Sequence, residues 1–322
     1  MKAVVMNRYG TPDVLELKDV AKPTPKADEV LVRVHAASVN DWDWGLLHGT
    51  PFVNRMVSGL FTPKVRIIGG DIAGCVEAVG GDVSAFEQGD EVYGDLCLSG
   101  FGAFAEYVCA PEACLVHKPA GMTFEQAAAI PQAGMLAVQG LIDAGRIQSG
   151  QTLLLNGAGG GVGTFALQMA KLYEAEITVV DKPGKLEMLR AMGADHVVDY
   201  LKEDFTKGDK CYDLILDTKT NRSPLAYTRV LNPNGTYVTV GGSMPRLLQA
   251  LVVGPFVSRI SSKHVRIVSL KPNKDLAYMN ELFEAGELVP VIEGPYKLAD
   301  VPDALRFFGT GDHKGKITVT MV

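Results

Sequence analysis

Long apolar runs and an excess of positive charge are both missing from this sequence of 322 residues. No apolar run approaches the roughly 20 residues that a membrane-spanning helix needs. The chain carries 31 Lys and Arg against 37 Asp and Glu, a formal net charge of −6. Because broad binding to nucleic acid or to an anionic membrane needs a basic face, we expect neither as a partner. The opening stretch MKAVVMNRYG lacks the apolar core of a secretory signal and indicates a first strand, so we expect a cytoplasmic protein.

Cysteine is also scarce. The five cysteines form no CxxC pair, and an odd number without paired spacing does not indicate a disulfide framework. Cys109 and Cys114 have no histidine or further cysteine beside them at the spacing of zinc ligands. We therefore expect free thiols in a reducing compartment at Cys75, Cys97, Cys109, Cys114 and Cys211.

Signatures of several enzyme classes are absent. The chain has no GxSxG nucleophile elbow, and it has no GxxxxGK[ST] phosphate loop. Its six histidines are scattered, with no two of them at positions i and i+4. Nucleophile and histidine-metal chemistry are therefore disfavoured.

The first 120 residues are typical of short strands separated by turns. In 29-EVLVRVHA-36, valines at every second position have the period of a half-buried strand. The stretches 71–80, 89–94 and 102–111 continue this pattern between Gly, Asp and Pro residues. This part of the chain is predicted to be all-β or barrel-like.

The pattern changes at Pro119. Thr123 and Gln126 match a capping box, in which each side chain bonds the backbone of the other residue at a helix start. They open the helical run 124–130, which Pro131 ends.

After a further helical run at 133–145, strands and helices alternate, which predicts a parallel doubly wound sheet. The closing stretch 315–322 returns to a strand pattern and is expected to complete the first domain. The alternating segments lie at 153–156, about 163–174, 176–181, about 185–192, 196–200, 213–217, 224–231 and 236–242.

The stretch 153-LLLNGAGGGVGTFALQMAK-171 holds four glycines in five positions, between a strand pattern and a helix pattern. A phosphate cradle needs exposed backbone N–H groups at a helix N-terminus, with no side chain in the way. A GxGxxG motif fails from Gly157, because its sixth position is Val162, but AxGxxG fits from Ala158. The alternative is a plain flexible turn. The predicted pyrophosphate-binding residues are Ala158, Gly160, Gly161, Val162 and Gly163.

Asp181 ends the second strand of this unit, 181 − 163 = 18 positions after Gly163. A carboxylate there can accept hydrogen bonds from the adenosine ribose and repels a 2′-phosphate, which favours NAD(H). Lys182 and Lys185 act in the opposite direction, because they could pair with that phosphate. Both lysines could equally be a solvated helix start. The choice between NADH and NADPH stays open, with a lean to NAD(H).

Taken together, these motifs resemble the medium-chain dehydrogenase/reductase superfamily, in its zinc-free quinone oxidoreductase-like branch. The resemblance runs along nearly the whole chain. The segments on which the resemblance rests are 38-SVNDWDW-44, 69-GGDIAGCVEAVG-80, 89-GDEVYGD-95, 102-GAFAEYV-108, 129-AIPQAG-134, 157-GAGGGVG-163, 192-MGADHVVDY-200 and the GK before the last strand.

The resemblance implies an α/β fold with two parts. A GroES-like β-rich catalytic domain would comprise 1–122 and 271–322, and a Rossmann domain with a doubly wound parallel sheet would comprise 123–270. It implies a cleft between them in which nicotinamide meets substrate, and relatives of this kind are often homodimers. The stretch 181-DKPGK-185 replaces the serine-containing stretch that commonly reads a 2′-phosphate, which puts an NADPH preference in doubt.

The zinc-dependent relatives carry a catalytic cysteine and a GHE motif. Here the cysteine position is Asn40 and GHE has become Gly69-Gly70-Asp71, so we expect no metal. Without a metal, hydrogen-bond donors must stabilise the charge that develops on the acceptor oxygen. Asn40 is the best candidate donor, although it could instead cap the end of a strand. Asp43 matches a commonly acidic position and is either structural or close to the nicotinamide.

The resemblance also implies contacts on the cofactor side. Gln132 would lie near the nicotinamide and Tyr200 beside the adenosine half. Gly241 and Gly242 would let the backbone approach the carboxamide. Lys316 would reach the cofactor from the tail, unless it is a solvated lysine before the last strand.

The sequence therefore predicts a zinc-independent NAD(P)H oxidoreductase that reduces a quinone, an α,β-unsaturated carbonyl or a related carbonyl compound. The alternative is a nucleotide-binding redox sensor or structural protein without turnover. The apolar segment 243–262 is either a specificity element or an interface helix.

Overall fold

A computed structural model of the chain describes residues 1–321, and the side chains of all of these except residues 53 and 57. The chain forms two compact units. Unit 1 contains Met1–Ala133 and the chain from Pro272 onward, and unit 2 contains Gly134–Lys271. The sequence-based division had placed the first boundary after residue 122 and the second after residue 270. Residue 322, the last of the predicted closing strand, lies outside the described residues.

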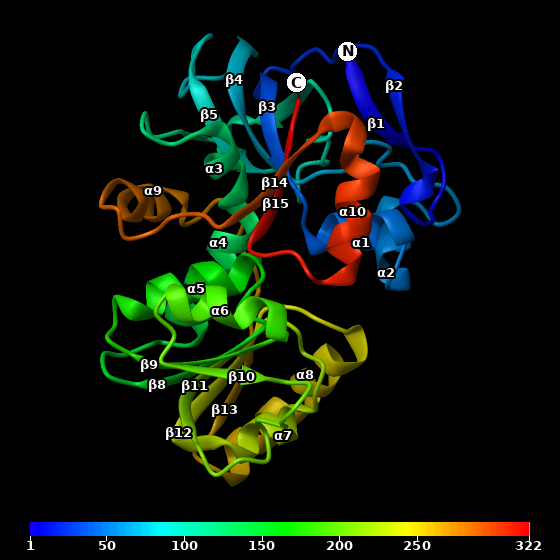
Figure 1. The fold of residues 1–322 in the computed structure, drawn as a ribbon. Helices are drawn as coiled ribbons and strands as arrows, with labels where there is room; N and C mark the ends of the chain where they lie inside the picture. Colours follow the sequence, from blue (N-terminus) through cyan, green and yellow to red (C-terminus); the bar gives the residue numbers. More distant parts are fainter. Residues whose placement is uncertain (322) are drawn as a thin grey trace. The chain divides into compact units, whose positions relative to one another are not determined.

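Unit 1 is built on a mainly antiparallel sheet, whose strands are labelled in Figure 1. Its strand order is β14-β15-β3-β4-β5-β7, with β6 also paired to β3, and β1 and β2 form a separate antiparallel pair. The strands are β1 (Lys2–Met6), β2 (Leu15–Asp19), β3 (Glu29–Ser38), β4 (Asp71–Val79), β5 (Glu91–Asp95), β6 (Tyr107–Pro111), β7 (Val116–His117), β14 (Ile292–Lys297) and β15 (Lys316–Thr320).

The helices of unit 1 are short and lie between or beside these strands. They are α1 (Asp41–His48), α2 (Phe52–Ser58), α3 (Phe124–Ala129), α9 (Leu276–Glu284) and α10 (Val301–Thr310), with 3₁₀ turns at η1 (Pro12–Val14), η2 (Glu112–Cys114) and η4 (Leu298–Asp300). The predicted capping box opens α3: the Gln126 N–H donates to Thr123 Oγ1 at 3.2 Å, and the Thr123 N–H donates to Gln126 Oε1 at 3.0 Å.

The tail completes the sheet of unit 1. β15 pairs antiparallel with β3, so that Thr318 lies opposite Ser38, and β3 pairs on its other side with β4, so that Ser38 lies opposite Asp71. Three segments that are far apart in the sequence therefore meet at one level of the sheet. This level carries the polar cluster described below.

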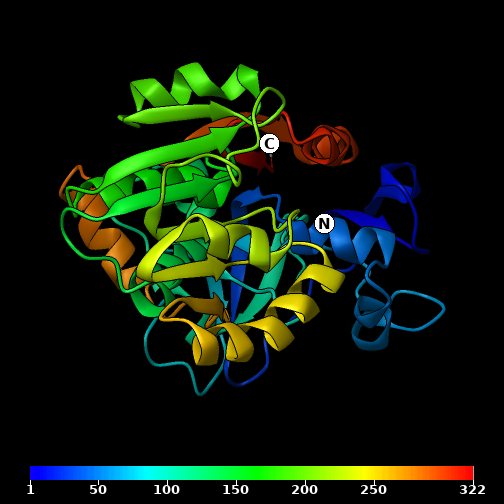
Figure 2. The same cartoon turned by 90° about the horizontal axis from the view of Figure 1, so that it is seen from below.

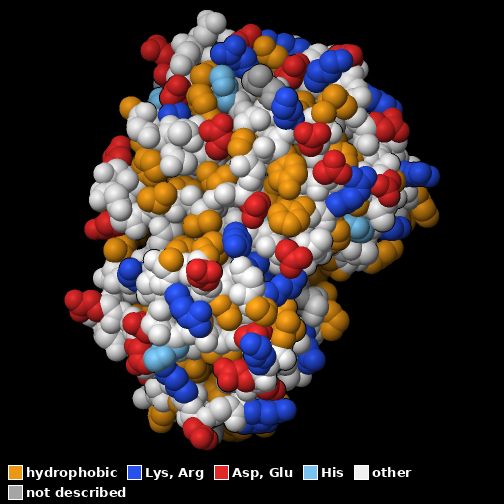
Figure 3. All heavy atoms as spheres, viewed as in Figure 1, with side chains coloured by type: hydrophobic (Ala, Val, Ile, Leu, Met, Phe, Trp, Pro, Cys, Tyr) orange, Lys and Arg blue, Asp and Glu red, His pale blue; other side chains and the backbone are white. Residues whose placement is uncertain are grey.

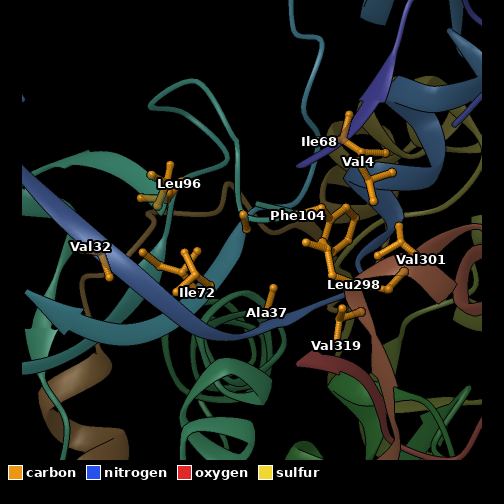
Figure 4. Packing of buried hydrophobic residues seen from close by; sticks show 14 of the residues in the cluster. Val4, Val32, Ala37, Ile68, Ile72, Leu96, Phe104, Leu298, Val301 and Val319 are labelled. Carbon is orange, nitrogen blue, oxygen red and sulfur yellow. The ribbon is translucent and has the colours of Figure 1, made fainter. Parts of the chain in front are cut away.

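The core of unit 1 is made by apolar side chains from these strands and from α10. The valines of the alternating strand pattern, Val30, Val32 and Val34, are buried, as the pattern predicted. Figure 4 shows part of this core, with Phe104 among Val4, Ile68, Leu298 and Val301. Burying such side chains removes apolar surface from water, which is the main force that holds the strands together.

Unit 2 is a six-stranded, fully parallel sheet in the order β10-β9-β8-β11-β12-β13. The first strand in the chain, β8, lies in the middle, and the order reverses between β8 and β11. This is the strand order of a dinucleotide-binding doubly wound fold. The strands are β8 (Thr152–Asn156), β9 (Glu176–Asp181), β10 (His196–Asp199), β11 (Tyr212–Asp217), β12 (Leu231–Thr239) and β13 (His264–Ile267).

Helices cover both faces of this sheet. Figures 1 and 2 show α5 and α6 on one face, and α7 and α8 on the other. The helices are α4 (Pro131–Val138), whose first three residues belong to unit 1 and which continues into the π-helical segment η3 (Gln139–Ala144), α5 (Gly161–Lys171), α6 (Pro183–Ala191), α7 (Pro224–Arg229) and α8 (Met244–Ile260). No helix among residues 1–321 is long and apolar enough to cross a membrane.

Candidate functional site

The glycine stretch links β8 to α5 at the point where the strand order reverses. Gly157 has a φ of +81°, which suits a residue without a Cβ, and its N–H donates to the Val180 carbonyl of the neighbouring strand at 2.9 Å. A Cβ on Gly163 would come within 2.4 Å of the Ala158 Cα, so helix and loop can approach only with glycine there. A Cβ on Gly160 would meet nothing closer than 3.8 Å.

This geometry is that of an anion cradle. Gly160 is the N-cap residue of α5, and its carbonyl accepts a hydrogen bond of 3.0 Å from the Thr164 N–H, one turn into the helix. The N–H groups of the first helical turn have no intrahelical acceptor, and the helix dipole places partial positive charge there. The structure thus brings Ala158, Gly160, Gly161, Val162 and Gly163 together around a helix N-terminus that can bind a pyrophosphate.

Asp181 lies at the end of β9 and is only 4% exposed. Its Oδ2 accepts a hydrogen bond of 2.7 Å from the Gly159 N–H, and its Oδ1 accepts one of 2.8 Å from the Lys182 N–H. The carboxylate therefore braces the glycine loop from the adjacent strand. Gly159, which was not among the predicted site residues, is the loop residue that it holds.

Lys185 is buried beside this carboxylate, with its side chain 2% exposed and its Nζ 3.9 Å from Asp181 Oδ1. A Cβ on Gly159 would come within 2.6 Å of Lys185 Cδ, so the absence of a side chain at Gly159 makes room for the lysine stem. Lys182 is half-buried at the start of α6. The interpretation of a solvated helix start does not describe Lys185.

A second loop at the same edge of the sheet depends on residues that sequence reasoning missed. Asp217 ends β11, and its Oδ1 accepts hydrogen bonds from Asn156 Nδ2 at 2.8 Å and from the N–H groups of Lys219 and Thr220 at 3.0 and 2.9 Å. The Tyr237 hydroxyl donates to its Oδ2 at 2.9 Å. The sequence held one sign of these residues: Asn156 and Asp217 are polar residues at the ends of the apolar strands LLLN and DLILD.

Three further predicted cofactor residues of unit 2 lie at this same edge. Tyr200 directly follows Asp199, which is paired with Asp181 across β9 and β10. Gly241 and Gly242 follow β12; a Cβ on Gly241 would meet nothing within 4 Å, whereas Gly242, at a φ of +119°, lies against Thr220. Because carboxyl ends of parallel strands share one edge, these residues and the glycine loop surround one region of unit 2.

In unit 1, a buried polar cluster surrounds Asp71, the first residue of β4. Its Oδ2 accepts hydrogen bonds from Ser38 Oγ and Asn40 Nδ2, both at 2.9 Å, and from the Lys316 ammonium at 3.2 Å. Its Oδ1 accepts from the Gln132 N–H at 3.2 Å. Four residues that the sequence scatters from 38 to 316 thus share one carboxylate.

The sequence-predicted residues Asn40, Gln132 and Lys316 all belong to this cluster. The Lys316 ammonium also donates to Asn40 Oδ1 and, at 3.1 Å, to the Val39 carbonyl. Its side chain is 4% exposed. The interpretation of Lys316 as a solvated residue therefore does not describe the structure.

Asp43 is fully buried in the first turn of α1. Its Oδ2 accepts from the Asn40 N–H and its Oδ1 from the Gly69 N–H, both at 2.8 Å. Burial raises the pKa of Asp43 to about 7, and the nearby Asp71 charge adds to this rise while the two N–H groups oppose it. The carboxyl holds the start of α1 and the turn before β4 around the cluster, which is the structural role considered from the sequence.

Asp95 and Cys97 border the cluster on the Gln132 side. Gln132 Nε2 lies 3.0 Å from Cys97 Sγ, and Asp95 Oδ1 accepts from the Cys97 N–H at 2.7 Å. Burial, with the Asp71 charge second, raises the pKa of Asp95 to about 6, and burial followed by the Asp95 charge raises that of Cys97. The Cys97 thiol is therefore protonated at neutral pH and serves as a weak acceptor for the amide.

Among residues 1–321, no group of three or more His, Cys, Asp or Glu side chains has a geometry that could hold a metal ion. Gly70 stands where a histidine of the GHE motif would be, and a Cβ there would come within 2.3 Å of Cys97 Sγ. All five cysteines are free thiols.

Comparisons with known proteins agree with this architecture. A profile described as alcohol dehydrogenase GroES-like domain matches residues 26–120, and one described as zinc-binding dehydrogenase matches residues 192–319. The chain is 33% identical over 334 residues to the 2-methylene-furan-3-one reductase of Solanum lycopersicum, over 99% of this chain and 79% of that protein. It is 32% identical over 330 residues to the chloroplastic NADPH-dependent alkenal/one oxidoreductase of Arabidopsis thaliana, again over 99% of this chain and 79% of that protein.

The solved structure of the quinone oxidoreductase from Coxiella burnetii matches with a TM-score of 0.89 at 27% identity, covering 100% of this chain and 99% of that one. A GroES-like part, a dinucleotide-binding parallel sheet and these relatives define an oxidoreductase architecture. The chain belongs to the medium-chain dehydrogenase/reductase superfamily, in its quinone oxidoreductase-like branch. The family and the two-part α/β fold class predicted from the sequence are confirmed.

Proposed function

We propose that the chain transfers a hydride from NAD(P)H to a quinone, an α,β-unsaturated carbonyl or a related carbonyl compound. The observation that carries this proposal is the bare helix N-terminus after β8, where Gly163 allows close packing and Gly160 leaves open space. The names of the relatives, an alkenal/one oxidoreductase and a quinone oxidoreductase among them, agree with it. Membership of this branch confirms the predicted class, an NAD(P)H-dependent oxidoreductase.

Unit 2 would hold the dinucleotide. The N–H groups of Gly161, Val162 and Gly163 would bind the pyrophosphate, Tyr200 would lie beside the adenosine, and Gly241 would admit the carboxamide. When bound, the nicotinamide supplies a hydride, which carries both electrons of the reduction. One proton from water completes the reduced product.

The cofactor would be NADH in preference to NADPH. Asp181 is a buried carboxylate at the end of β9, and its charge disfavours a phosphate on the adenosine ribose. Lys185 lies 3.9 Å from it and partly offsets this charge. Because the lysine is held by the same carboxylate, we expect the repulsion to prevail.

Unit 1 would stabilise the acceptor oxygen without a metal. The Asn40 amide has two N–H groups, and Asp71 uses one of them, so the other is available to a carbonyl oxygen on which negative charge develops. Two observations support zinc-independent chemistry. The free N–H of Asn40 is a donor for the acceptor oxygen, and Asn40 and Gly70 stand where the zinc-dependent relatives have metal ligands.

Purified protein titrated with NADH and with NADPH, followed by nicotinamide fluorescence, tests the proposal first. We expect saturable binding, oxidation of the bound nucleotide by 1,4-benzoquinone, and no loss of rate in a metal chelator. Loss of activity in the chelator and its return with zinc would refute the metal-free mechanism. Tight binding without oxidation by any quinone or enone would support the alternative, a redox sensor or structural protein.

We also propose that the chain is a homodimer in which a second copy covers α8. Leu251, Val252 and Ile260 on this helix are 64%, 75% and 68% exposed, and β13 beside it is the free edge of the sheet. Exposed apolar groups of this extent commonly mark an interface. A specificity element in the same segment is the competing interpretation.

A cytoplasmic location and the absence of nucleic-acid or membrane partners complete the proposal. The five free thiols suit a reducing compartment. Figure 3 shows Lys and Arg side chains mixed with Asp and Glu over the face in view, which does not favour a polyanionic partner. Fractionation of cells that express the full chain tests the location.

A further inference from the structure

The orientation of the Asn40 amide is determined by two partners of opposite character. The Lys316 ammonium can only donate hydrogen bonds, and it lies against Asn40 Oδ1. The Asp71 carboxylate accepts from Asn40 Nδ2 at 2.9 Å. Rotating the amide by half a turn would set its NH₂ against the ammonium and its oxygen against the carboxylate. The surroundings therefore allow one orientation only.

The two partners are themselves held in place. Lys316 donates to the Val39 carbonyl at 3.1 Å and to Asp71 Oδ2 at 3.2 Å as well as to Asn40, so its three N–H groups each have an acceptor within unit 1. Asp71 receives further hydrogen bonds from Ser38 Oγ and the Gln132 N–H. A lysine that uses all its donors in this way has none left for a ligand.

The same contacts change the chemistry of the free amide N–H. A positive charge against the carbonyl oxygen of an amide draws electron density from its nitrogen, and hydrogen bonds in a chain strengthen one another in a medium of low polarity. Asn40 is 5% exposed and Lys316 is 4% exposed, so water weakens this effect little. The remaining N–H of Asn40 is thus both fixed in direction and strengthened as a donor.

We infer that Lys316 is a positioning residue for the reduction: with Asp71, it orients and polarises the Asn40 amide toward the acceptor oxygen and makes no contact with the cofactor. This inference rests on the proposed function, because it needs Asn40 to face the acceptor. It differs from the interpretation drawn from the sequence, in which Lys316 reaches the dinucleotide. The two interpretations predict different effects of losing Lys316: a positioning role lowers kcat, whereas a cofactor contact weakens NADH binding.

The test compares Lys316→Met with Lys118→Met. Lys118 is the matched control, since its side chain is 3% exposed and its ammonium pairs with Glu91 and with the carbonyls of Pro119 and Met122 in the same unit. We expect Lys316→Met to lower kcat by about 10- to 100-fold, a smaller loss than removal of a direct oxyanion donor. NADH affinity, measured by fluorescence, should stay within about twofold. Lys118→Met should change neither constant.

A second measurement separates positioning from general loosening of the structure. Hydride addition to an enone gives an enolate oxygen, which is more basic than the oxygen of the hydroquinone anion formed from 1,4-benzoquinone. Reduction of the enone therefore depends more on a strong hydrogen-bond donor. We expect Lys316→Met to lose more rate with an enone than with the quinone. An equal loss with both acceptors, or a similar loss in Lys118→Met, would overturn the inference.

Other outcomes distinguish this inference from the proposed function. If Lys316→Met weakens NADH binding about tenfold and leaves kcat unchanged, Lys316 contacts the cofactor and the inference is wrong. If the wild-type protein binds NADH but reduces no quinone or enone, the proposed function itself fails. Should Lys316→Met not fold, Lys316→Arg keeps the charge but not the geometry, and a reduced kcat with normal NADH affinity is expected; an unchanged kcat would overturn the inference.

Discussion

The backbone N–H of Gly159 donates a hydrogen bond of 2.7 Å to Oδ2 of Asp181, so the acid at the end of β9 holds the glycine loop itself. The sequence assigned this acid to the ribose of a bound cofactor. In the structure its other oxygen accepts from the Lys182 N–H and lies 3.9 Å from the Lys185 ammonium. The shape of the loop and the charge beside the proposed adenosine site thus depend on one carboxylate.

Replacing this carboxylate should change cofactor selectivity. In Asp181→Ser, the charge that opposes a 2′-phosphate is gone, and the Lys185 ammonium no longer has the Asp181 carboxylate 3.9 Å away. A hydrogen bond to a charged group contributes about 1.5–3 kcal/mol, so the ratio of the NADH to the NADPH dissociation constant should rise at least tenfold. Both constants are measured by fluorescence titration.

Asp195→Ser is the control for this variant. Asp195 Oδ2 accepts a backbone hydrogen bond of 2.7 Å from Ile177 near the start of the same strand, so its loss removes a similar bond far along β9 from the loop. It should leave the selectivity ratio unchanged. If Asp181→Ser weakens both cofactors equally, Asp181 only braces the loop and does not select the cofactor.

Gly163→Ala should disrupt the cradle because the added Cβ would lie 2.4 Å from the Ala158 Cα. Overpacking of this kind costs about 1–3 kcal/mol, and the helix must move away from the loop to relieve it. We expect a lower melting temperature and loss of NADH binding. Gly184→Ala on α6 is the matched control, since its Cβ would meet nothing within 4 Å. Equal effects in the two variants would contradict this account.

Local patterns were sufficient to predict the elements around the cradle. Apolar runs closed by polar residues predicted β8 and β9, and the capping box at Thr123 predicted the start of α3, because these signals lie within a few residues of one another. The burial of Lys185 was not predictable in this way. It depends on the space left by Gly159, which is 26 residues away (185 − 159 = 26) and is adjacent only after the strands have paired.

The polar cluster of unit 1 marks the limit of sequence reasoning more clearly. Asn40, Gln132 and Lys316 were each singled out, but nothing in the sequence showed that one carboxylate, Asp71, joins them. Their meeting follows from the register of three strands, in which Ser38 faces both Thr318 and Asp71. Because register is set by long-range pairing, periodicity along the chain does not contain it.

Leu251→Glu on α8 should convert the proposed homodimer into a monomer. Leu251 is 64% exposed, and a carboxylate at that position would have to be buried, without a partner, when a second copy covers the helix. The mass in solution, measured by light scattering during gel filtration, should fall by half. Leu172→Glu, at a leucine that is 40% exposed at the end of α5, should leave the mass unchanged. A monomeric wild-type protein, or altered turnover with unaltered mass, would instead favour a specificity element.

Asp43 should make the stability of the chain depend on pH. Its pKa is about 7 in the folded chain against 3.8 for an exposed carboxyl, because burial penalises the ionised form. Between these two values the folded chain holds a proton that the unfolded chain has released, so the contribution of Asp43 to stability is greatest at about pH 4 and below, and it falls as the pH rises toward 7. Above pH 7 this contribution no longer changes.

In Asp43→Asn the side chain is neutral at every pH, so this dependence disappears. We therefore expect the stability advantage of the wild-type chain over Asp43→Asn, followed by urea unfolding from pH 4.5 to 8, to narrow steadily up to about pH 7. Asp41→Asn, which makes the same change of side chain at the exposed first residue of the same helix, is the control. A pH-independent difference for Asp43→Asn would show that the buried carboxyl is already ionised in the folded chain. The two backbone N–H groups and the Lys316 ammonium would then outweigh the cost of burial.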